Sequence, residues 1–327
     1  MEIGIVIIGI NVEKYISDCI QSVKESNYPK ELLKIVYVDG GSRDKSVDIA
    51  KSIEGVSVIE LKEKHPTPGR GRNAGWKVLS AAYIQFLDGD TIIHPDWLKN
   101  AVNAFKIDIA AVCGKREERF PDKNIFHFIT EVEWKYEIGY CRYFGGDVLI
   151  KRDVLEKTQG FDEYLIAGED PELSYRIRGL GLKILRIDCK MTTHDINMSF
   201  FSQYLKRAYR SGYAYAEIGL KFLKTTEKLW LKELLRTSLK CLIPIFLIIF
   251  GFLNGFSFLG LILASIIVFK PFLKISEFKK KYDIKLEKAI FYSLHLSFVC
   301  FPQFVGILRY YAGLVMNNPL KNKGLNE

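Results

Sequence analysis

Short apolar segments alternate with longer amphipathic segments along the first third of the chain. The apolar runs predict strands at residues 3–10, 33–39, 56–60, 83–88 and 107–114. Between them, hydrophobic residues recur at helical spacing and predict helices over 12–26, 45–53, 70–82 and 95–105. Strands that are apolar throughout and are separated by helices are typical of a mainly parallel sheet covered by helices on both faces. We therefore expect an α/β fold in this region.

The C-terminal part has a different pattern, because two long segments carry no charged residue. They cover residues 241–269 and 289–308, which are 29 and 20 residues long, and a helix needs about 20 to cross a bilayer. Lysines flank the first segment on both sides, and Asn254-Gly255 at its middle is a turn signal. Both flanks therefore belong in the cytoplasm, and we favour a helical hairpin over one tilted span. The second segment either spans the membrane or lies at its surface.

Charge and composition narrow the class of protein. Residues 1–197 carry 28 basic and 31 acidic side chains, whereas 198–327 carry 19 and 7, so the net charge of +9 arises from the second part. In residues 199–240 aromatic and basic residues alternate, as in a helix at the level of lipid headgroups or one packed on a soluble domain. Uncharged segments follow directly, so we expect membrane lipid and no nucleic acid as a partner.

The same features predict the domain organisation and the compartment. We expect a first domain at 1–198, interfacial helices at 199–240 and a membrane region at 241–327. The apolar run at 3–10 lacks a basic start and is too short for a signal peptide, so we interpret it as a strand. Six scattered cysteines without a Cys-x-x-Cys pair exclude a disulfide scaffold and a zinc ribbon, and indicate a reducing compartment.

Polar residues that directly follow predicted strands are the first candidates for a site, because ligands bind at the carboxyl ends of such strands. Asp39 ends the second strand and precedes two glycines, a pattern that suits either a turn or a close approach to a ligand. Asp88 and Asp90 follow the fourth strand, with Gly89 between them. Two carboxylates at this spacing can hold a hard divalent ion that also binds substrate phosphates, although a turn has the same pattern.

Two further segments carry candidate chemistry at the start of a predicted helix. The run GRGRNAG (69–75) is preceded by no strand and is therefore no dinucleotide fingerprint, but its arginines at a helix start suit a phosphate. An ordinary solvated helix start explains the same pattern. Glu169 and Asp170 precede Pro171 at the first turn of another helix, where a carboxylate either caps the helix or removes a proton from an attacking hydroxyl.

Taken together, these segments resemble the family 2 glycosyltransferases of the membrane-anchored bacterial and archaeal type. The resemblance covers roughly residues 1–210 and rests on six motifs in order: IVIIGIN (5–11), VDGGSRDKS (38–46), GRGRNAG (69–75), YIQFLDGDTIIHPDWL (83–98), YFGGDVLIKRDVL (143–155) and GFDEYLIAGEDPELSYRIRGLG (160–181). It implies a GT-A fold, a nucleotide-diphosphate sugar donor, Mn²⁺ or Mg²⁺, and inversion at the anomeric carbon. The Q-x-x-R-W motif of processive synthases is absent, since Gln203 and Arg207 are four apart with no Trp following, which disfavours a processive enzyme.

The resemblance also implies a role for individual residues. Asp170 matches the catalytic base, with Glu169 beside it, and Asp90 matches the metal ligand. The residues that match the nucleotide site are Gly9, Asn11, Asp39, Arg72 and Asp88, where Asp88 lies by the ribose or the metal. His194 falls where some relatives place a metal or diphosphate contact. Gly145, Gly146 and Asp147 match the stretch on the acceptor side, although these residues alone also suit a tight turn.

The sequence thus predicts an enzyme that transfers a sugar to a lipid-linked or membrane-proximal hydroxyl acceptor in glycan or polysaccharide biosynthesis. We expect it at the cell membrane, with the catalytic domain on the cytoplasmic side. Two alternatives remain open at this point. A polyprenyl phosphate is itself the acceptor in the first, and in the second the chain is a nucleotide-binding membrane subunit without turnover.

Overall fold

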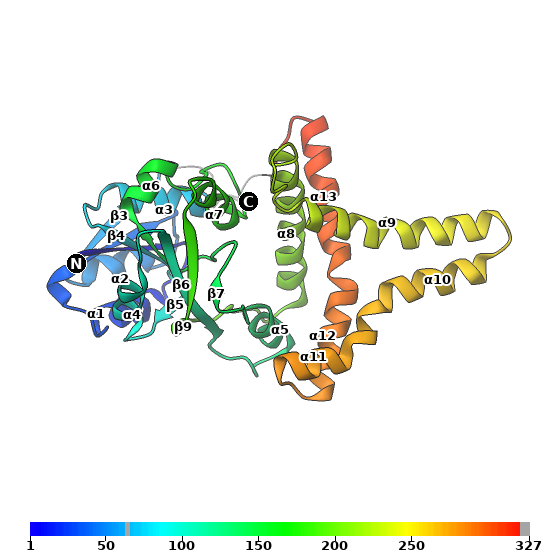
Figure 1. Cartoon of the computed structure of the whole chain (residues 1–327), viewed down its shortest axis with the longest axis horizontal. Helices are drawn as coiled ribbons and strands as arrows, with labels where there is room; N and C mark the ends of the chain where they lie inside the picture. Colours follow the sequence, from blue (N-terminus) through cyan, green and yellow to red (C-terminus); the bar gives the residue numbers. More distant parts are fainter. Residues whose placement is uncertain (63–65, 321–327) are drawn as a thin grey trace. The chain divides into compact units, whose positions relative to one another are not determined.

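The computed structural model describes residues 1–62 and 66–320, which fold as two units (Figure 1). The first unit consists of residues 1–121 and 133–196, and the second of residues 122–132 and 197–320. The first unit contains every strand of the described part of the chain, and the second is helical.

The first unit is built on one mixed sheet. Its strands are β1 (Ile3–Gly9), β2 (Leu33–Asp39), β3 (Val56–Glu60), β4 (Tyr83–Asp88), β5 (Thr91–Ile93), β6 (Ile109–Glu118), β7 (Gly139–Tyr140), β8 (Val148–Lys151) and β9 (Lys183–His194). They lie in the order β3-β2-β1-β4-β8-β6-β9-β5, with β7 paired to β9. The strands β1 to β4 pair in parallel, whereas β8 runs antiparallel to both of its neighbours.

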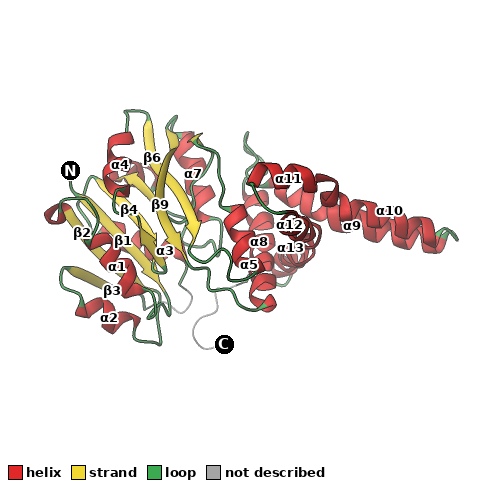
Figure 2. Cartoon of the chain, turned by 90° about the horizontal axis from the view of Figure 1, so that it is seen from below, coloured by secondary structure: helices red, strands yellow, loops and turns green. Residues whose placement is uncertain are grey.

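Helices pack against this sheet (Figure 2). They are α1 (Ile16–Lys24), α2 (Ser46–Ser52), α3 (Pro68–Lys77), α4 (Trp97–Ala104), α6 (Arg152–Thr158) and α7 (Glu169–Gly179), with a 3₁₀ turn η1 (Lys30–Leu32). The core lies between sheet and helices and contains fully buried side chains such as Ile5, Phe86 and Trp97. Gly75 lets α3 approach β1 closely, because a Cβ atom there would lie 3.1 Å from side-chain carbons of both Val6 and Val38. The predicted α/β class is therefore confirmed.

The second unit consists of long helices. They are α5 (Ile125–Glu133), α8 (Phe201–Lys221), α9 (Leu231–Leu253), α10 (Ser257–Phe269), η2 (Lys270–Lys274), α11 (Ile275–Tyr282), α12 (Leu286–Phe298) and α13 (Cys300–Val315). Three helical stretches are long and apolar enough to cross a membrane, namely Leu231–Leu253, Ser257–Tyr282 and Leu286–Val315. Their apolar side chains are largely exposed, as for Phe252 and Phe258, which are both 77% exposed.

The helices α9 and α10 lie side by side as a hairpin (Figure 2). The turn falls at Asn254-Gly255, the pair that the sequence singles out, and Gly255 has a φ of +76° that favours glycine. Gly251 and Gly260 face each other across the hairpin, because a Cβ atom on Gly251 would lie only 3.1 Å from the Cα atom of Gly260. Small residues thus allow the two backbones to approach closely.

Candidate functional site

Strand register aligns the first predicted site residues at one edge of the sheet. In the parallel pairs, Gly9 lies opposite Asp39, and Ile8 lies opposite Asp88. The carboxyl ends of β1, β2 and β4 therefore lie at the same edge of the sheet. Gly89, which follows Asp88, donates its backbone N–H to the Ile8 carbonyl at 2.7 Å, and a Cβ atom on it would lie 3.1 Å from that oxygen.

Asp39 is buried and organises its own loop. Its carboxylate accepts hydrogen bonds from the backbone N–H groups of Gly41 and Ser42, from the Ser42 hydroxyl and from the Tyr37 hydroxyl. Asn11, which has a φ of +54°, ties this loop to the end of β1. Its backbone N–H donates to Ser42 Oγ at 2.8 Å. The Asp39 carboxylate thus already accepts four hydrogen bonds from its own loop and strand. Its implied contact with a nucleobase stays a prediction.

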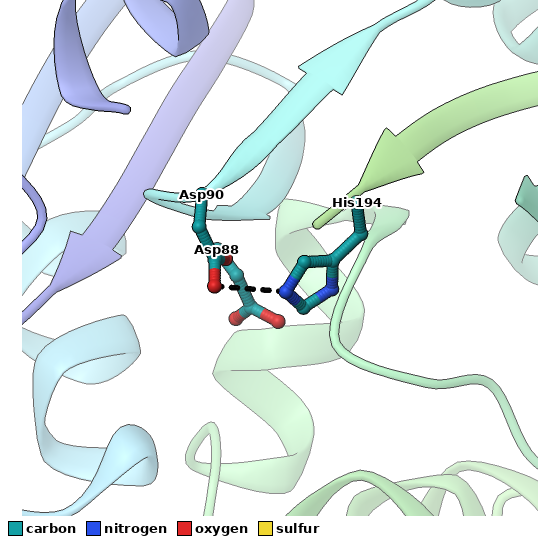
Figure 3. A group of neighbouring side chains, drawn as sticks. All are labelled: Asp88, Asp90 and His194. Carbon is teal, nitrogen blue, oxygen red and sulfur yellow. Dashed lines mark hydrogen bonds and ion pairs between the residues drawn. The ribbon is translucent and has the colours of Figure 1, made fainter. Parts of the chain in front are cut away.

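Asp88, Asp90 and His194 come together although 104 residues separate the last two (Figure 3). The antiparallel pairing of β5 with β9 places Thr91 opposite His194, which brings the neighbouring Asp90 to the imidazole. Asp90 Oδ2 lies 2.8 Å from His194 Nε2. One possible ligand atom from each of the three residues lies within 4.8 Å of the others.

This group of three has donor chemistry that fits a divalent cation. Carboxylate oxygens suit Mg²⁺ and Mn²⁺, and an imidazole nitrogen shifts the preference toward a transition metal such as Mn²⁺. The side chains are partly exposed, at 30% for Asp90 and 27% for Asp88, which leaves room for further oxygen ligands from a substrate. Such a cation would offset negative charge on a leaving diphosphate.

Arg116 and Trp134 belong to the same site, and the sequence analysis missed both. Arg116, on β6, has its Nη2 atom 3.3 Å from Asp88 Oδ2 and also in contact with His194 Nδ1. Trp134 stacks on the His194 ring with centroids 5.3 Å apart, and the Arg116 guanidinium lies 4.6 Å over the indole. Arg116 stands among charged residues in GKREERF after the fifth predicted strand, and its position at a strand end was the one available signal.

Arg72 joins this group to the second pair of carboxylates. It lies on α3, which begins after Thr67, and its side chain is only 3% exposed. Nη2 donates to Asp88 Oδ1 at 3.1 Å, and Nη1 donates to Glu169 Oε1 at 2.6 Å. Burial lowers the pKa of Arg72, but the carboxylates of Asp170, Glu169 and Asp88 outweigh it and raise the pKa above its usual value. Conversely, Arg72 and Arg116 lower the pKa of the Asp88 carboxyl, although burial opposes them.

Glu169 and Asp170 lie in the first turn of α7, where the helix dipole favours negative charge. Asp170 Oδ1 lies 3.4 Å from Arg72 Nη1, yet it accepts no hydrogen bond from the described residues. Burial raises the pKa of Asp170 to about 8, with Arg72 opposing and Glu169 and Asp88 adding to the increase. A carboxylate with such a high proton affinity is suited to accept a proton.

The three residues predicted on the acceptor side occupy different environments. A Cβ atom on Gly146 would lie 2.7 Å from Asp88 Oδ2 and 3.1 Å from Arg72 Nη2, whereas one on Gly145 would meet no atom within 4 Å. The Asp147 side chain is fully buried, accepts a hydrogen bond from Thr192 at 2.6 Å, and accepts the Asp88 backbone N–H at 3.3 Å. Burial raises the pKa of Asp147, with Arg116 opposing. In this arrangement Gly146 and Asp147 position Asp88.

Comparison with known sequences assigns the chain to a family. Residues 4–161 match the profile of "Glycosyl transferase family 2", and residues 126–200 match that of the "N-terminal domain of galactosyltransferase". The chain belongs to glycosyltransferase family 2. The first match spans the strands β1 to β4 and thus includes Asp39, Arg72, Asp88 and Asp90.

Curated relatives of this family 2 glycosyltransferase include archaeal and bacterial proteins. Glycosyltransferase AglE of Haloferax volcanii is 24% identical over 220 residues, which are 64% of this chain and 71% of the relative. O-antigen chain rhamnosyltransferase RfbN of Salmonella typhimurium is 27% identical over 217 residues, which are 60% of this chain and 67% of the relative.

Solved structures confirm the GT-A fold of this family 2 glycosyltransferase. Mannosyltransferase PcManGT from Pyrobaculum calidifontis, in complex with GDP-Man and Mn²⁺, matches with a TM-score of 0.58 at 15% identity. That match covers 97% of this chain and 86% of the other. S. aureus TarS 1-349 in complex with UDP-GlcNAc matches with a TM-score of 0.55 at 15% identity, covering 97% and 92%.

Proposed function

We propose that the chain is an inverting, metal-dependent glycosyltransferase that moves a sugar from a nucleotide-diphosphate donor to a hydroxyl group of a membrane-associated acceptor. One observation carries the proposal: Arg72 bonds Asp88 on one side and Glu169 on the other, with Asp170 beside them. A candidate cation site and a candidate base are thus held together by one buried guanidinium.

The donor and the cation would occupy the side of Asp88, Asp90 and His194. Their oxygens and imidazole nitrogen would hold Mn²⁺ or Mg²⁺, which supplies charge neutralisation at the departing diphosphate. The relative TarS was solved with UDP-GlcNAc and PcManGT with GDP-Man and Mn²⁺, which supports this class of donor. Arg72 and Arg116 add positive charge beside the same carboxylate.

The acceptor would be activated by Asp170. The Asp170 carboxylate takes the proton of the acceptor hydroxyl while the acceptor oxygen attacks the anomeric carbon from the face opposite the diphosphate. Glu169 keeps Arg72 in place through its 2.6 Å bond, and Arg72 in turn orients Asp170. The resulting single displacement inverts the configuration at the anomeric carbon.

The acceptor is proposed to be lipid-linked or close to the membrane, and the site to face the cytoplasm. Three apolar helical stretches support membrane association, and the lysines on both sides of the hairpin favour cytoplasmic flanks. The names of the relatives place AglE among glycosyltransferases and RfbN in O-antigen synthesis, which supports a role in glycan biosynthesis.

The test is a transfer assay on the full chain in membranes. Radiolabelled nucleotide sugars are added with Mn²⁺ or Mg²⁺, and label is counted in the organic phase for the wild type, Asp170→Asn and Asp153→Asn. Asp153 is an exposed residue on α6 that pairs with Lys157, so its variant is the matched control. We expect Asp170→Asn to bind donor normally and to lose transfer by about 100-fold or more, because general base catalysis contributes that much.

Other outcomes separate the alternatives. Normal transfer by Asp170→Asn would show that Asp170 is not the base. Label that mild acid releases from the lipid would indicate a polyprenyl-phosphate sugar. No turnover of any donor, with nucleotide binding retained, would favour a non-catalytic nucleotide-binding subunit.

A further inference from the structure

Arg116 bonds the same side chains that would hold a divalent cation. Its Nη2 atom lies 3.3 Å from Asp88 Oδ2 and also contacts His194 Nδ1. Its Nε atom lies 3.5 Å from Asp147 Oδ2, and the side chain is 13% exposed. Two members of the group formed by Asp88, Asp90 and His194 are therefore hydrogen-bonded to one guanidinium.

Hydrogen-bond chemistry makes this arrangement incompatible with metal ligation by His194. A guanidinium only donates, so Nδ1 of His194 accepts, and in a neutral ring the proton then resides on Nε2 and is donated to Asp90. A cation bound to Nε2 would move that proton to Nδ1, where it would face the Arg116 donor. A cation bound to Nδ1 would take the place of Arg116 directly. Either way, Arg116 and the cation exclude each other at His194.

Arg116 also contacts the ring of Trp134, and a donor diphosphate would offer it another hydrogen-bonding partner. Its guanidinium lies 4.6 Å over the Trp134 ring, which can hold a cation without any carboxylate. A diphosphate bound beside Asp88 would offer oxygens that match the guanidinium fork better than a single imidazole nitrogen does. Moving to such a diphosphate would free both Asp88 and His194.

We propose that Arg116 is a positioning residue that competes with the divalent cation for Asp88 and His194 and is drawn away by the diphosphate of the donor. The proposal rests on the proposed function. It makes metal binding by the protein alone weak, and it links metal affinity to the presence of the nucleotide. Because a diphosphate is itself a metal ligand, the decisive measurement is the affinity for metal without nucleotide.

The experiment measures Mn²⁺ binding to the purified full-length protein in detergent by electron paramagnetic resonance, without nucleotide. It compares the wild type with Arg116→Met and with Arg119→Met. Arg119 is the matched control because it lies just beyond the end of the same strand, yet its guanidinium faces Asp18 at 3.8 Å and the Phe120 ring. We expect Arg116→Met to bind Mn²⁺ about tenfold more tightly than the wild type, since charge-assisted bonds no longer compete. Arg119→Met should bind like the wild type.

Three results would overturn the proposal. Arg116→Met could bind Mn²⁺ no more tightly than the wild type, Arg119→Met could gain as much affinity, or no protein could bind Mn²⁺ at all. The last result also removes the metal from the proposed function, whereas Asp170-dependent sugar transfer tests the glycosyltransferase itself. If Arg116→Met does not fold, as judged by circular dichroism, Arg116→Lys serves instead. Its single ammonium group makes fewer bonds, so a smaller gain is expected, and an affinity no tighter than that of the wild type contradicts the proposal.

Discussion

At the scale of single residues, the main feature of the site is that its carboxylates outnumber the arginine side chains that pair with them. Arg72 alone contacts Asp88, Glu169 and Asp170, so each carboxylate shares its positive charge with two others. Asp88 gains a second partner in Arg116, but Asp170 does not. Burial raises the pKa of both carboxyls, but Arg72 and Arg116 together outweigh it at Asp88, whereas at Asp170 it prevails and raises the pKa to about 8. Two neighbouring carboxylates are thereby prepared for different tasks.

A pH dependence of transfer follows from the raised pKa of Asp170. The proposed base works only when ionised, so kcat/KM should rise with pH, reach half of its maximum near pH 8 and level off from about pH 9. An ordinary aspartate would give a plateau from about pH 5. Initial rates across pH 5 to 9 at saturating metal check this expectation. A rate that is flat across that range would contradict it.

The stability of the fold should show the opposite trend. Between the pKa of an unfolded aspartate, about 4, and the folded value near 8, the folded state holds a proton that the unfolded state has lost. The free energy of unfolding therefore falls as pH rises through this window, by at most about 1.4 kcal/mol per pH unit. Asp170→Asn cannot titrate, so its unfolding midpoint should depend less on pH than that of the wild type. Equal pH dependence in both proteins would be the contrary result.

Of the adjacent residues Gly145 and Gly146, only Gly146 lies so close to other side chains that a methyl group would not fit. We expect Gly146→Ala to reduce transfer by about 100-fold, because its new methyl group would displace Asp88 and Arg72. Gly145→Ala is the matched comparison, since a methyl group there meets no atom within 4 Å, and its loss should be much smaller. Steady-state transfer rates with one donor measure both variants. A loss of equal size in the two would show that Gly145 contacts the acceptor, as the family resemblance implies.

At the scale of elements, the first strands were predictable because their signal is local. The strands at 33–39, 56–60 and 83–88 have the predicted bounds, since each is a short apolar run bounded by polar residues. The helix expected over 70–82 instead covers Pro68–Lys77, because Thr67 caps its start and Pro68 suits the first position. The short antiparallel strands β5, β7 and β8 were not predicted, because residues distant in sequence provide their partners.

In the candidate site too, residues in local motifs were predictable from the sequence, whereas a residue brought in by distant strand pairing was not. Asp88, Asp90 and Asp170 follow strands or begin helices in recognisable motifs, and the structure brings the first two together with His194. Arg116 had no such motif. The pairing of β6 with β9 brings Arg116 to the site. It places Glu118 opposite His194, and Arg116 lies two residues before Glu118 on β6.

The hairpin of α9 and α10 depends on its glycines. Gly260→Leu should separate the helices, because a Cβ atom at this position would lie only 2.5 Å from the backbone oxygen of Leu247 on the opposite helix. Overpacking of this kind costs about 1–3 kcal/mol, so the unfolding temperature in detergent should fall by several degrees. Ser265→Leu places the same side chain on an exposed position of α10 and should leave the temperature unchanged. An unchanged temperature for Gly260→Leu would show that the helices do not pack closely.

At the scale of the whole molecule, the length of the hairpin limits how deep it can reach. Its charge-free arms are Cys241–Leu253 and Ser257–Phe269, each about 20 Å long at 1.5 Å per residue. The hydrocarbon core of a bilayer is about 30 Å thick. Lys240 precedes the first arm and Lys270 follows the second, so the charge-free stretch ends at these two residues. We therefore expect the turn at Asn254 to stop inside the bilayer.

Cysteine labelling tests this depth. Asn254→Cys should resist a membrane-impermeant maleimide in intact cells and in opened membranes, and should react only after detergent is added. Thr226→Cys, in the exposed turn between α8 and α9, should react as soon as the membrane is opened. The wild type gives the background from its native cysteines. Labelling of Asn254→Cys in intact cells would instead mean that the hairpin crosses the bilayer.

A hairpin that ends inside the bilayer has an effect beyond anchoring. Its two helices add more cross-sectional area to the leaflet they enter than to the opposite one, so lipids on the two sides are packed unequally around it. Strain of this kind is relieved where a membrane already bends toward the enzyme's side or where small headgroups leave packing defects. The glycines that hold α9 and α10 together would thus also influence where on a membrane surface the enzyme accumulates, and so which acceptors it meets.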